Sequence, residues 1–97
     1  MYASIITTKL RAEQIDQAAE TLRDILTSAS PEGWQHTYLV VNRQTGQLMS
    51  FGVWDSEAEA VAYESSGRFQ QDAQKMREFM EGAPERRTGE IILKIQR

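Results

Sequence analysis

Residues 34–54 read WQHTYLVVNRQTGQLMSFGVW, and this stretch predicts the centre of the fold. Two segments rich in β-branched and aromatic residues, 34–42 and 47–54, flank a short polar stretch that contains Gly46. Segments of this composition favour strands. A polar stretch with a glycine suited to a left-handed conformation favours a hairpin turn. The sequence therefore predicts an antiparallel hairpin at the centre of the chain.

A strand and a helix precede this hairpin. Residues 2–9 are rich in Ile, Thr and Tyr and have no helical period, which predicts a strand. Residues 11–29 place apolar side chains at steps of three and four, with acidic residues mainly off that stripe. This pattern predicts an amphipathic helix, and Pro31 ends it.

A second helix and a last strand follow the hairpin. Ser56 stands three residues before a glutamate, the spacing of a capping box, and predicts the start of the helix. The small residues at 65–67 predict a break or bend, and Gly82 and Pro84 predict the end. The last strand is expected at 88–96, and it would have three apolar residues on one face: Ile91, Leu93 and Ile95.

The predicted element order is β-α-β-β-α-β within a single domain, residues 1–97. Two strand–helix–strand halves joined by a hairpin give the ferredoxin-like arrangement, an α+β fold. It has a four-stranded antiparallel sheet with two helices on one face.

The hairpin also predicts what each face of the sheet carries. With a four-residue loop at 43–46, Asn42 lies opposite Gln47. One face then holds Thr37, Leu39, Val41, Leu48, Ser50, Gly52 and Trp54, and the other holds His36, Tyr38, Val40, Met49, Phe51 and Val53. A sheet covered on one side should be polar on the other, but both faces are apolar, and an uncovered apolar face marks an interface. We expect a homodimer whose sheets meet face to face, although another turn length would exchange the faces of one strand.

Composition excludes several classes of function. Eleven basic and fourteen acidic residues give a net charge of −3 with no basic half, which argues against nucleic-acid or membrane partners. The chain has no cysteine and one histidine, which excludes a thiolate site and a two-histidine metal site within one chain. No apolar run approaches the ~18 residues of a membrane helix, and no signal peptide is recognisable. A cytoplasmic protein is expected.

The charged residues after the hairpin predict no site of their own. Four carboxylates gather at the start of the second helix: Asp55, Glu57, Glu59 and Glu64. Acidic residues suit a helix N-terminus, and their spacing spreads them around the helix, so no metal site is expected. Arg86 and Arg87 are interpreted as a solvated surface pair.

Residues 46–69 read GQLMSFGVWDSEAEAVAYESSGRF. A strand that ends in Val-Trp, a Ser-capped acidic helix, a small-residue break and a Phe together resemble the dimeric α+β barrel superfamily. Within it the chain is most similar to the antibiotic-biosynthesis monooxygenase-like domain. The resemblance implies a dimeric α/β barrel with a small-molecule pocket between the sheet and the helices of each subunit. Some members oxidise aromatic polyketide or quinol-type substrates without metal or flavin, others degrade haem, and others are isomerases or have no assigned chemistry.

The haem-degrading branch resembles this chain least. That branch uses an Asn on the first strand, the Trp on the third strand, and a His nine or ten residues later. Trp54 matches, but Thr7 stands at the first position, and Tyr63 and Glu64 stand at the last two. No haem, and no other cofactor, is therefore expected.

Trp54 and Tyr63 are the catalytic candidates. Trp54 would hold a flat aromatic ligand through its ring and N–H, or close the end of the core. Tyr63 would donate a hydrogen bond to a substrate oxyanion, or relay a proton if its pKa were lowered, or be an ordinary half-buried tyrosine. The substrate-binding candidates are Trp54, Thr37, Ser50, Thr7 and Phe69, although Phe69 also has the spacing of a core stripe with Met76 and Met80.

Two hypotheses for function follow. The first is a small homodimeric, monooxygenase-like enzyme that oxidises a small aromatic or quinol-type substrate without a cofactor. Its weakness is the missing base, because His36 falls on the sheet face opposite Trp54. The second is a non-enzymatic dimeric module that binds a small apolar ligand or a protein partner.

Overall fold

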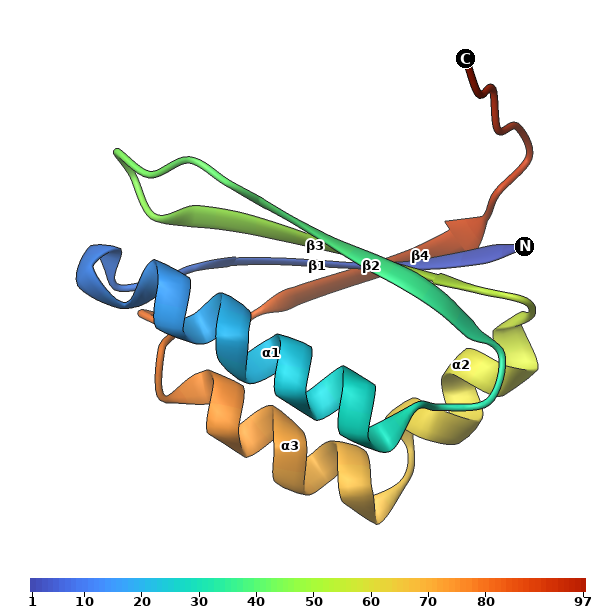
Figure 1. Ribbon diagram of the computed structural model, residues 1–97, viewed down its shortest axis with the longest axis horizontal. Helices are drawn as coiled ribbons and strands as arrows, with labels where there is room; N and C mark the ends of the chain where they lie inside the picture. The colour runs from blue at the N-terminus through green and yellow to red at the C-terminus, as the bar shows by residue number, and fades with distance from the viewer.

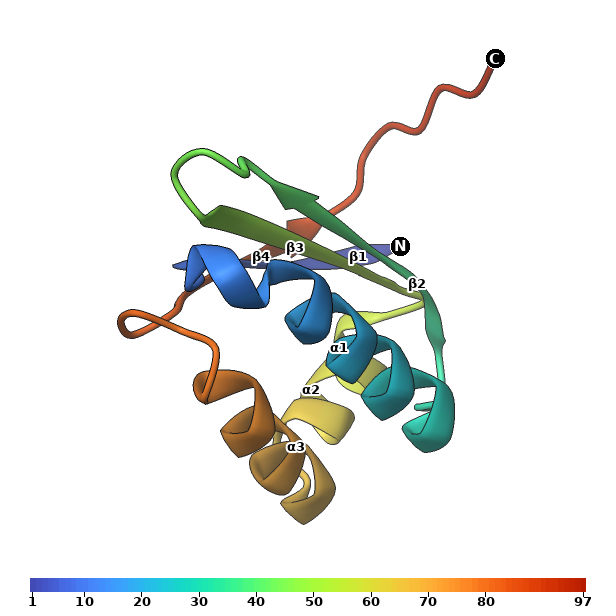
Figure 2. The same cartoon turned by 60° about the vertical axis from the view of Figure 1, so that its left-hand side comes forward.

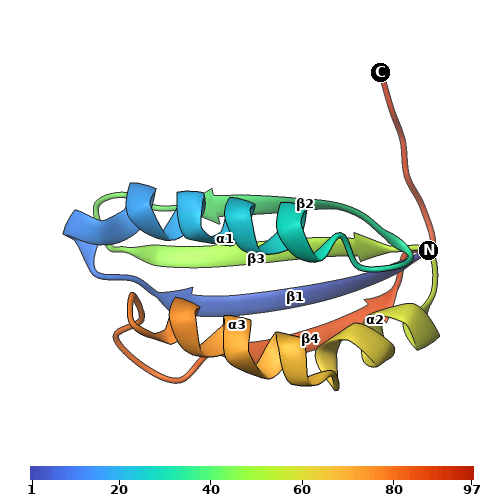
Figure 3. The same cartoon turned by 60° about the horizontal axis from the view of Figure 1, so that its bottom comes forward.

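A four-stranded sheet and three helices form two layers in the computed structural model, which describes residues 1–97 (Figure 1). All three helices cover the same face of the sheet (Figures 1 and 3). In chain order the elements are β1 (Tyr2–Lys9), the 3₁₀ turn η1 (Ala12–Gln14), α1 (Ile15–Ala29), β2 (Trp34–Val41), β3 (Gln47–Trp54), α2 (Glu57–Glu64), α3 (Gly67–Arg77) and β4 (Glu85–Glu90).

The sheet has the order β2-β3-β1-β4, and every pair of neighbours is antiparallel. The two central strands, β1 and β3, are each the first strand of a strand–helix–strand half, as in a ferredoxin-like fold. The predicted α+β fold is confirmed. None of the helices is both long and apolar enough to cross a membrane.

The hairpin register is the predicted one over most of its length. Leu39 lies opposite Ser50 and Val41 opposite Leu48. Gly46 has φ +79° and a backbone in contact with Leu10, so the predicted left-handed glycine is confirmed. A bulge between Trp34 and His36 was not predicted.

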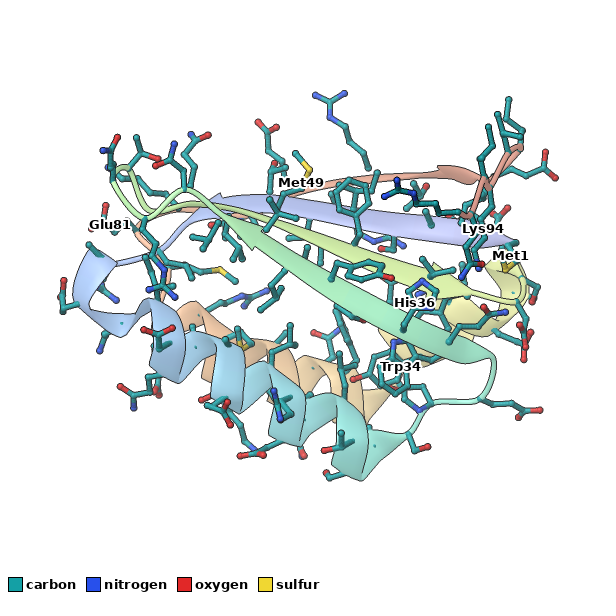
Figure 4. The ribbon with its side chains drawn as sticks, turned by 45° about the horizontal axis from the view of Figure 1, so that its top comes forward. Met1, Trp34, His36, Met49, Glu81 and Lys94 are labelled. Carbon is teal, nitrogen blue, oxygen red and sulfur yellow. The ribbon has the colours of Figure 1, made fainter.

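The bulge turns Trp34 toward the helices. Simple alternation would place it with His36 on the outer face, but the extra residue shifts the alternation by one. Trp34 therefore lies opposite Trp54 in the pairing and packs on the helix side (Figure 4). Its indole N–H donates to the Thr37 hydroxyl over 2.9 Å.

The helices begin and end somewhat differently from the prediction. The first is expected from residue 11, but residues 12–14 form a 3₁₀ turn and α1 starts at Ile15. The second is divided into α2 and α3 at the predicted break, where the Ser66 hydroxyl accepts from the Phe69 N–H and caps α3. The α3 helix ends at Arg77, five residues before Gly82.

The position of the last strand was predicted wrongly. It runs over Glu85–Glu90 rather than 88–96, and residues 91–97 form no strand. The reason is that pairing with β1, not apolar alternation, decides where this strand lies: Tyr2 pairs with Glu90, and the Ile91 N–H donates to the Met1 carbonyl. The segment 91–97, here called the tail, rises away from the sheet on the side opposite the helices (Figures 1 and 2).

The core is thin. Only 14 of 97 residues are buried, and ten of them form two clusters on the helix side of the sheet. The larger one contains Leu10, Ile15, Ala18, Ile25, Leu48, Met76 and Phe79, and the smaller one contains Tyr2, Trp54 and Ala60. A cavity separates the sheet from the helices between these clusters.

The outer face of the sheet carries apolar side chains that nothing in the protomer covers. Tyr38 is 61% exposed, Val40 57% and Met49 38%. His36 lies on the same face, with its ring 5.1 Å from that of Tyr38 (Figure 4). The predicted division of the hairpin residues between two faces is therefore observed.

Candidate functional site

A cavity of about 290 Å³ lies between the sheet and the helices. Its wall is mostly apolar, with side chains from all four strands and all three helices. This volume is at the lower end of the range of small-molecule sites, about 300–1,000 Å³. The cavity therefore has room for a ligand of one to three small rings.

Aromatic residues form one wall of the cavity. The ring of Tyr63 lies 5.7 Å from that of Trp54 and 5.4 Å from that of Phe69, the latter edge to face. These separations are typical of favourable aromatic pairs. Trp54 is only 4% exposed, at the end of β3. The three candidates Trp54, Tyr63 and Phe69 therefore come together, from β3, α2 and α3.

Small residues on β2 and β3 leave the cavity open next to the aromatic wall. Thr37, Ser50 and Gly52 all line the cavity, as their shared face predicts. A Cβ at Gly52 would lie 3.3 Å from the Trp54 indole nitrogen, so a larger residue there would crowd the indole. The Thr37 hydroxyl already accepts from Trp34, which leaves it one further acceptor position and its own proton.

Thr7 lies apart from this group. It pairs with Met49 on β3, and alternation places it on the outer face, while Ser4, Ile6 and Thr8 line the cavity. The hydroxyl of Thr8 is buried without a hydrogen-bond partner. On the first strand, therefore, Thr8 lines the cavity, and the predicted candidate Thr7 does not.

Tyr63 is an acid that resists ionisation. Burial, and then the negative charge of Asp72, raise the pKa of its phenol above the ordinary value of 10.0. This shift is opposite to the lowered pKa that the proton-relay option would need. At neutral pH the phenol is protonated and can donate a hydrogen bond into the cavity.

A charged cluster that the sequence did not predict lies at the cavity wall near Tyr63. Arg86 on β4 donates from Nε to Glu64 Oε2 and from Nη2 to Glu64 Oε1, both over 2.6 Å. The Ser4 hydroxyl donates to Glu64 Oε2 over 3.3 Å. The Glu64 side chain is 12% exposed and that of Arg86 44%. The hydrogen bonds and charge of Glu64 raise the pKa of Arg86.

A second carboxylate at the wall belongs to Asp72 on α3. Its side chain is 9% exposed and lies 3.3 Å from Arg68 Nε and 3.6 Å from Lys75 Nζ. Both cavity carboxylates are therefore paired with cations. The only histidine, His36, lies on the outer face, opposite to the face of Trp54, as the predicted hairpin register requires.

The sequence did not predict the charged cluster, because it predicted the last strand at 88–96 instead of Glu85–Glu90. A strand at 88–96 would leave Arg86 in a loop, and for that reason the sequence predicts that Arg86 and Arg87 form a solvated surface pair. The observed strand brings Arg86 opposite Ile6, on the cavity face, and Arg87 opposite Ile5, on the outer face. Glu64 was assigned to the acidic start of α2, but it is the last residue of that helix. Residues 85–90 read ERRTGE, which has no apolar alternation, so no local signal in the sequence pointed to this strand.

Comparisons with known proteins agree with this architecture. No protein-family model and no curated protein matches the chain. Among solved structures, one named an antibiotic biosynthesis monooxygenase from Deinococcus radiodurans is similar, with a TM-score of 0.77 and 16% identity over 99% of this chain and 97% of that one. The chain has the fold of the antibiotic-biosynthesis monooxygenase-like proteins.

Two further structures support the same conclusion about the fold. An antibiotic biosynthesis monooxygenase from Nitrosomonas europaea has a TM-score of 0.76 and 10% identity, over 96% of this chain and all of that one. A variant of SnoaB, a cofactor-independent oxygenase from Streptomyces nogalater, has a TM-score of 0.77 and 12% identity, over 99% and 97%. The resemblance stated from residues 46–69 is confirmed at the level of the fold.

Proposed function

We propose that the protein binds a small aromatic or quinol-type molecule in this cavity and oxidises it with dioxygen, without metal or flavin. The aromatic wall of Trp54, Tyr63 and Phe69 carries the proposal, because it offers ring contacts beside a hydrogen-bond donor. Support also comes from the fold, since one similar structure is named a cofactor-independent oxygenase.

The proposed reaction takes its electrons from the substrate. A ring methylene of the substrate, or of the keto tautomer of a quinol, loses a proton, and the resulting anion gives electrons to dioxygen as a C–O bond forms. Loss of water then leaves a carbonyl, so that CH₂ and O₂ become C=O and H₂O. Tyr63 donates a hydrogen bond to the oxyanion, and Trp54 orients the ring. Thr37 and Ser50 supply further hydroxyl contacts.

Oxygen uptake tests this proposal directly. Anthrone and 1,4-dihydroxynaphthalene are the substrates, and the rate is compared with buffer alone. Trp54→Phe and Tyr63→Phe should each lower kcat/KM by about 10- to 100-fold, the size expected for losing one oriented donor or contact. Tyr38→Phe is the matched control, because Tyr38 lies on the outer face. Uptake equal to buffer would exclude oxidation of these substrates.

A second candidate function is binding without catalysis. The pairing of Glu64 with Arg86, and of Asp72 with Arg68 and Lys75, favours it, since an ion-paired carboxylate is a weaker base than an unpaired one. Tryptophan fluorescence separates the two functions, because Trp54 faces the cavity. Saturable quenching by the aromatic probes without oxygen uptake would favour a binding module.

We also propose that two copies associate through the outer faces of their sheets. Tyr38, Val40 and Met49 on that face are exposed in the protomer. The tail adds Ile92, Leu93 and Ile95, which are 89%, 70% and 84% exposed, on the same side of the sheet (Figures 1 and 2). Burying apolar area of this kind is the main driving force for association. Light scattering that gives the 11.1 kDa protomer mass at micromolar concentration would overturn the dimer.

A further inference from the structure

We infer that Ser4, Glu64 and Arg86 form a subsite for the hydroxyl group of an aromatic ligand. This inference rests on the proposed binding of an aromatic molecule and names the chemical group that the cavity recognises. All three residues line the same cavity as the aromatic wall. They come from the paired strands β1 and β4 and from α2, and side-chain hydrogen bonds join Ser4 and Arg86 to Glu64.

The hydrogen bonds within the cluster leave both an acceptor position and donor groups free for a ligand. A carboxylate has about four acceptor positions, and three of those on Glu64 are used, two on Oε2 and one on Oε1. A guanidinium has five N–H donors, and Arg86 uses two of them on Glu64. One acceptor position on Oε1 and N–H groups on the guanidinium therefore remain.

A hydroxyl group fits this combination better than the alternatives. A hydroxyl both donates and accepts, so it can satisfy the free position on Glu64 and a free N–H of Arg86 together. A ligand carboxylate can only accept, and it would lie against the negative charge of Glu64. The charges of Glu64 and Arg86 cancel, so the cluster has no net attraction for an anion.

The position of the cluster fits an aromatic hydroxyl in particular. Ser4 pairs with Gly52, whose backbone adjoins the Trp54 indole nitrogen. Glu64 directly follows Tyr63 on α2. A ring held against Trp54 and Tyr63 therefore has the cluster at its edge, where a ring substituent projects.

The same geometry gives the proposed oxidation a proton acceptor. When a bound hydroxyl ionises, its proton passes to Glu64, and the resulting oxyanion takes Arg86 as its counter-ion. Atoms and charge balance in this step. Before it, the Glu64 carboxylate pairs with Arg86 and the ligand is a neutral hydroxyl; after it, the Glu64 carboxyl is neutral and the ligand oxyanion pairs with Arg86. The cavity has no histidine that would serve instead.

Calorimetric titration of three matched probes tests the inference: naphthalene, 1-naphthol and 1-naphthoate. The wild-type protein should bind 1-naphthol at least about 10-fold more tightly than naphthalene, because the analogue without a hydroxyl leaves the polar cluster unmatched. In Glu64→Gln and Arg86→Gln the preference should fall to within about 2-fold. Naphthalene should keep its affinity in both variants, since the aromatic wall is intact.

Matched controls come from the same elements. Arg87→Gln changes the neighbouring residue of β4, which faces outward, and Glu57→Gln changes an exposed residue of α2. Both should keep the wild-type preference. Arg86→Lys keeps the charge without the two-point pairing and should lose most of the preference, which serves as a second variant if Arg86→Gln fails to fold.

The outcomes separate this inference from the proposed function. Equal affinity of the wild type for naphthol and naphthalene would overturn the hydroxyl subsite and leave aromatic binding intact. Tighter binding of naphthoate than of naphthol would also overturn it, in favour of an anion site. Absence of binding by all three probes would remove aromatic binding and the subsite together.

Discussion

The two faces of the sheet carry similar numbers of apolar side chains and differ in what covers them. Leu48 and Met49 are neighbours on β3, yet Leu48 is 7% exposed under the helices and Met49 is 38% exposed on the outer face. The covered face has small and polar residues among the large ones, and they leave a cavity. No helix covers the outer face (Figure 1). The protomer therefore has one face for a small ligand and one face for another surface.

The difference is informative because the chain is short. A domain of this size buries only about 60–68% of the surface of its unfolded chain, and here the space under the helices is partly empty. A cavity removes packing contacts from a core that already contains few buried residues. An additional buried face, supplied by a second copy, would offset that loss.

The largest expected effect comes from truncating the two neighbours on β3. Leu48→Ala should lower the free energy of unfolding by about 2–5 kcal/mol at every protein concentration, since it leaves a hole in the larger core cluster. Met49→Ala should cost less, and its cost should grow with protein concentration, because its contacts form in the dimer. Urea unfolding at low and high micromolar concentration measures both.

This pair separates the two faces clearly. A Met49→Ala cost that is independent of concentration would mean that the outer face is not an interface. A Leu48→Ala cost that depends on concentration would mean that the covered face also takes part in association.

A charge on the outer face should have the next largest effect. Tyr38→Glu should weaken self-association by about 100-fold, or about 2.7 kcal/mol, because an unpaired carboxylate would be buried between the sheets. Sedimentation velocity over a range of concentrations measures the change. Val61→Glu is the control, because Val61 is also apolar and exposed, at 48%, but lies on α2. Equal dimer constants for the two variants would contradict the proposed interface.

Periodicity predicted the fold and most of the cavity because both depend on local sequence. Alternation along residues 36–41 and 47–54 placed Thr37, Ser50 and Trp54 on one face and His36 and Tyr38 on the other. The spacing of apolar residues predicted α1, and small residues predicted the break before α3. These signals need no knowledge of distant parts of the chain.

What the sequence did not predict depends on contacts between distant segments. The position of β4 is set by its pairing with β1, so apolar alternation in 91–97 misled the prediction of the last strand. The pairing of Glu64 with Arg86 joins residues 22 apart in sequence and followed only once that strand was placed. The pKa of Tyr63 depends on Asp72, which a separate helix brings close.

The smallest expected effect is a shift in the titration of one tyrosine, and it compares the two faces once more. Burial and the charge of Asp72 raise the pKa of Tyr63, whereas Tyr38 on the outer face is exposed to water in the protomer. Because the neutral phenol is favoured in the folded state, the associated stability is present below the ordinary pKa near 10. It is lost as the pH rises through the higher pKa of the folded protein.

Ultraviolet absorbance of tyrosinate measures this shift. Tyr63→Phe should remove the component that titrates above the ordinary range, and Tyr38→Phe should leave that component in place. Asp72→Asn should move the component to lower pH without removing it, because the neighbouring negative charge is gone while the burial remains. If Tyr63→Phe instead removed a component at or below the ordinary range, the phenol would be open to water. The aromatic wall would then be a surface, not the inside of a cavity.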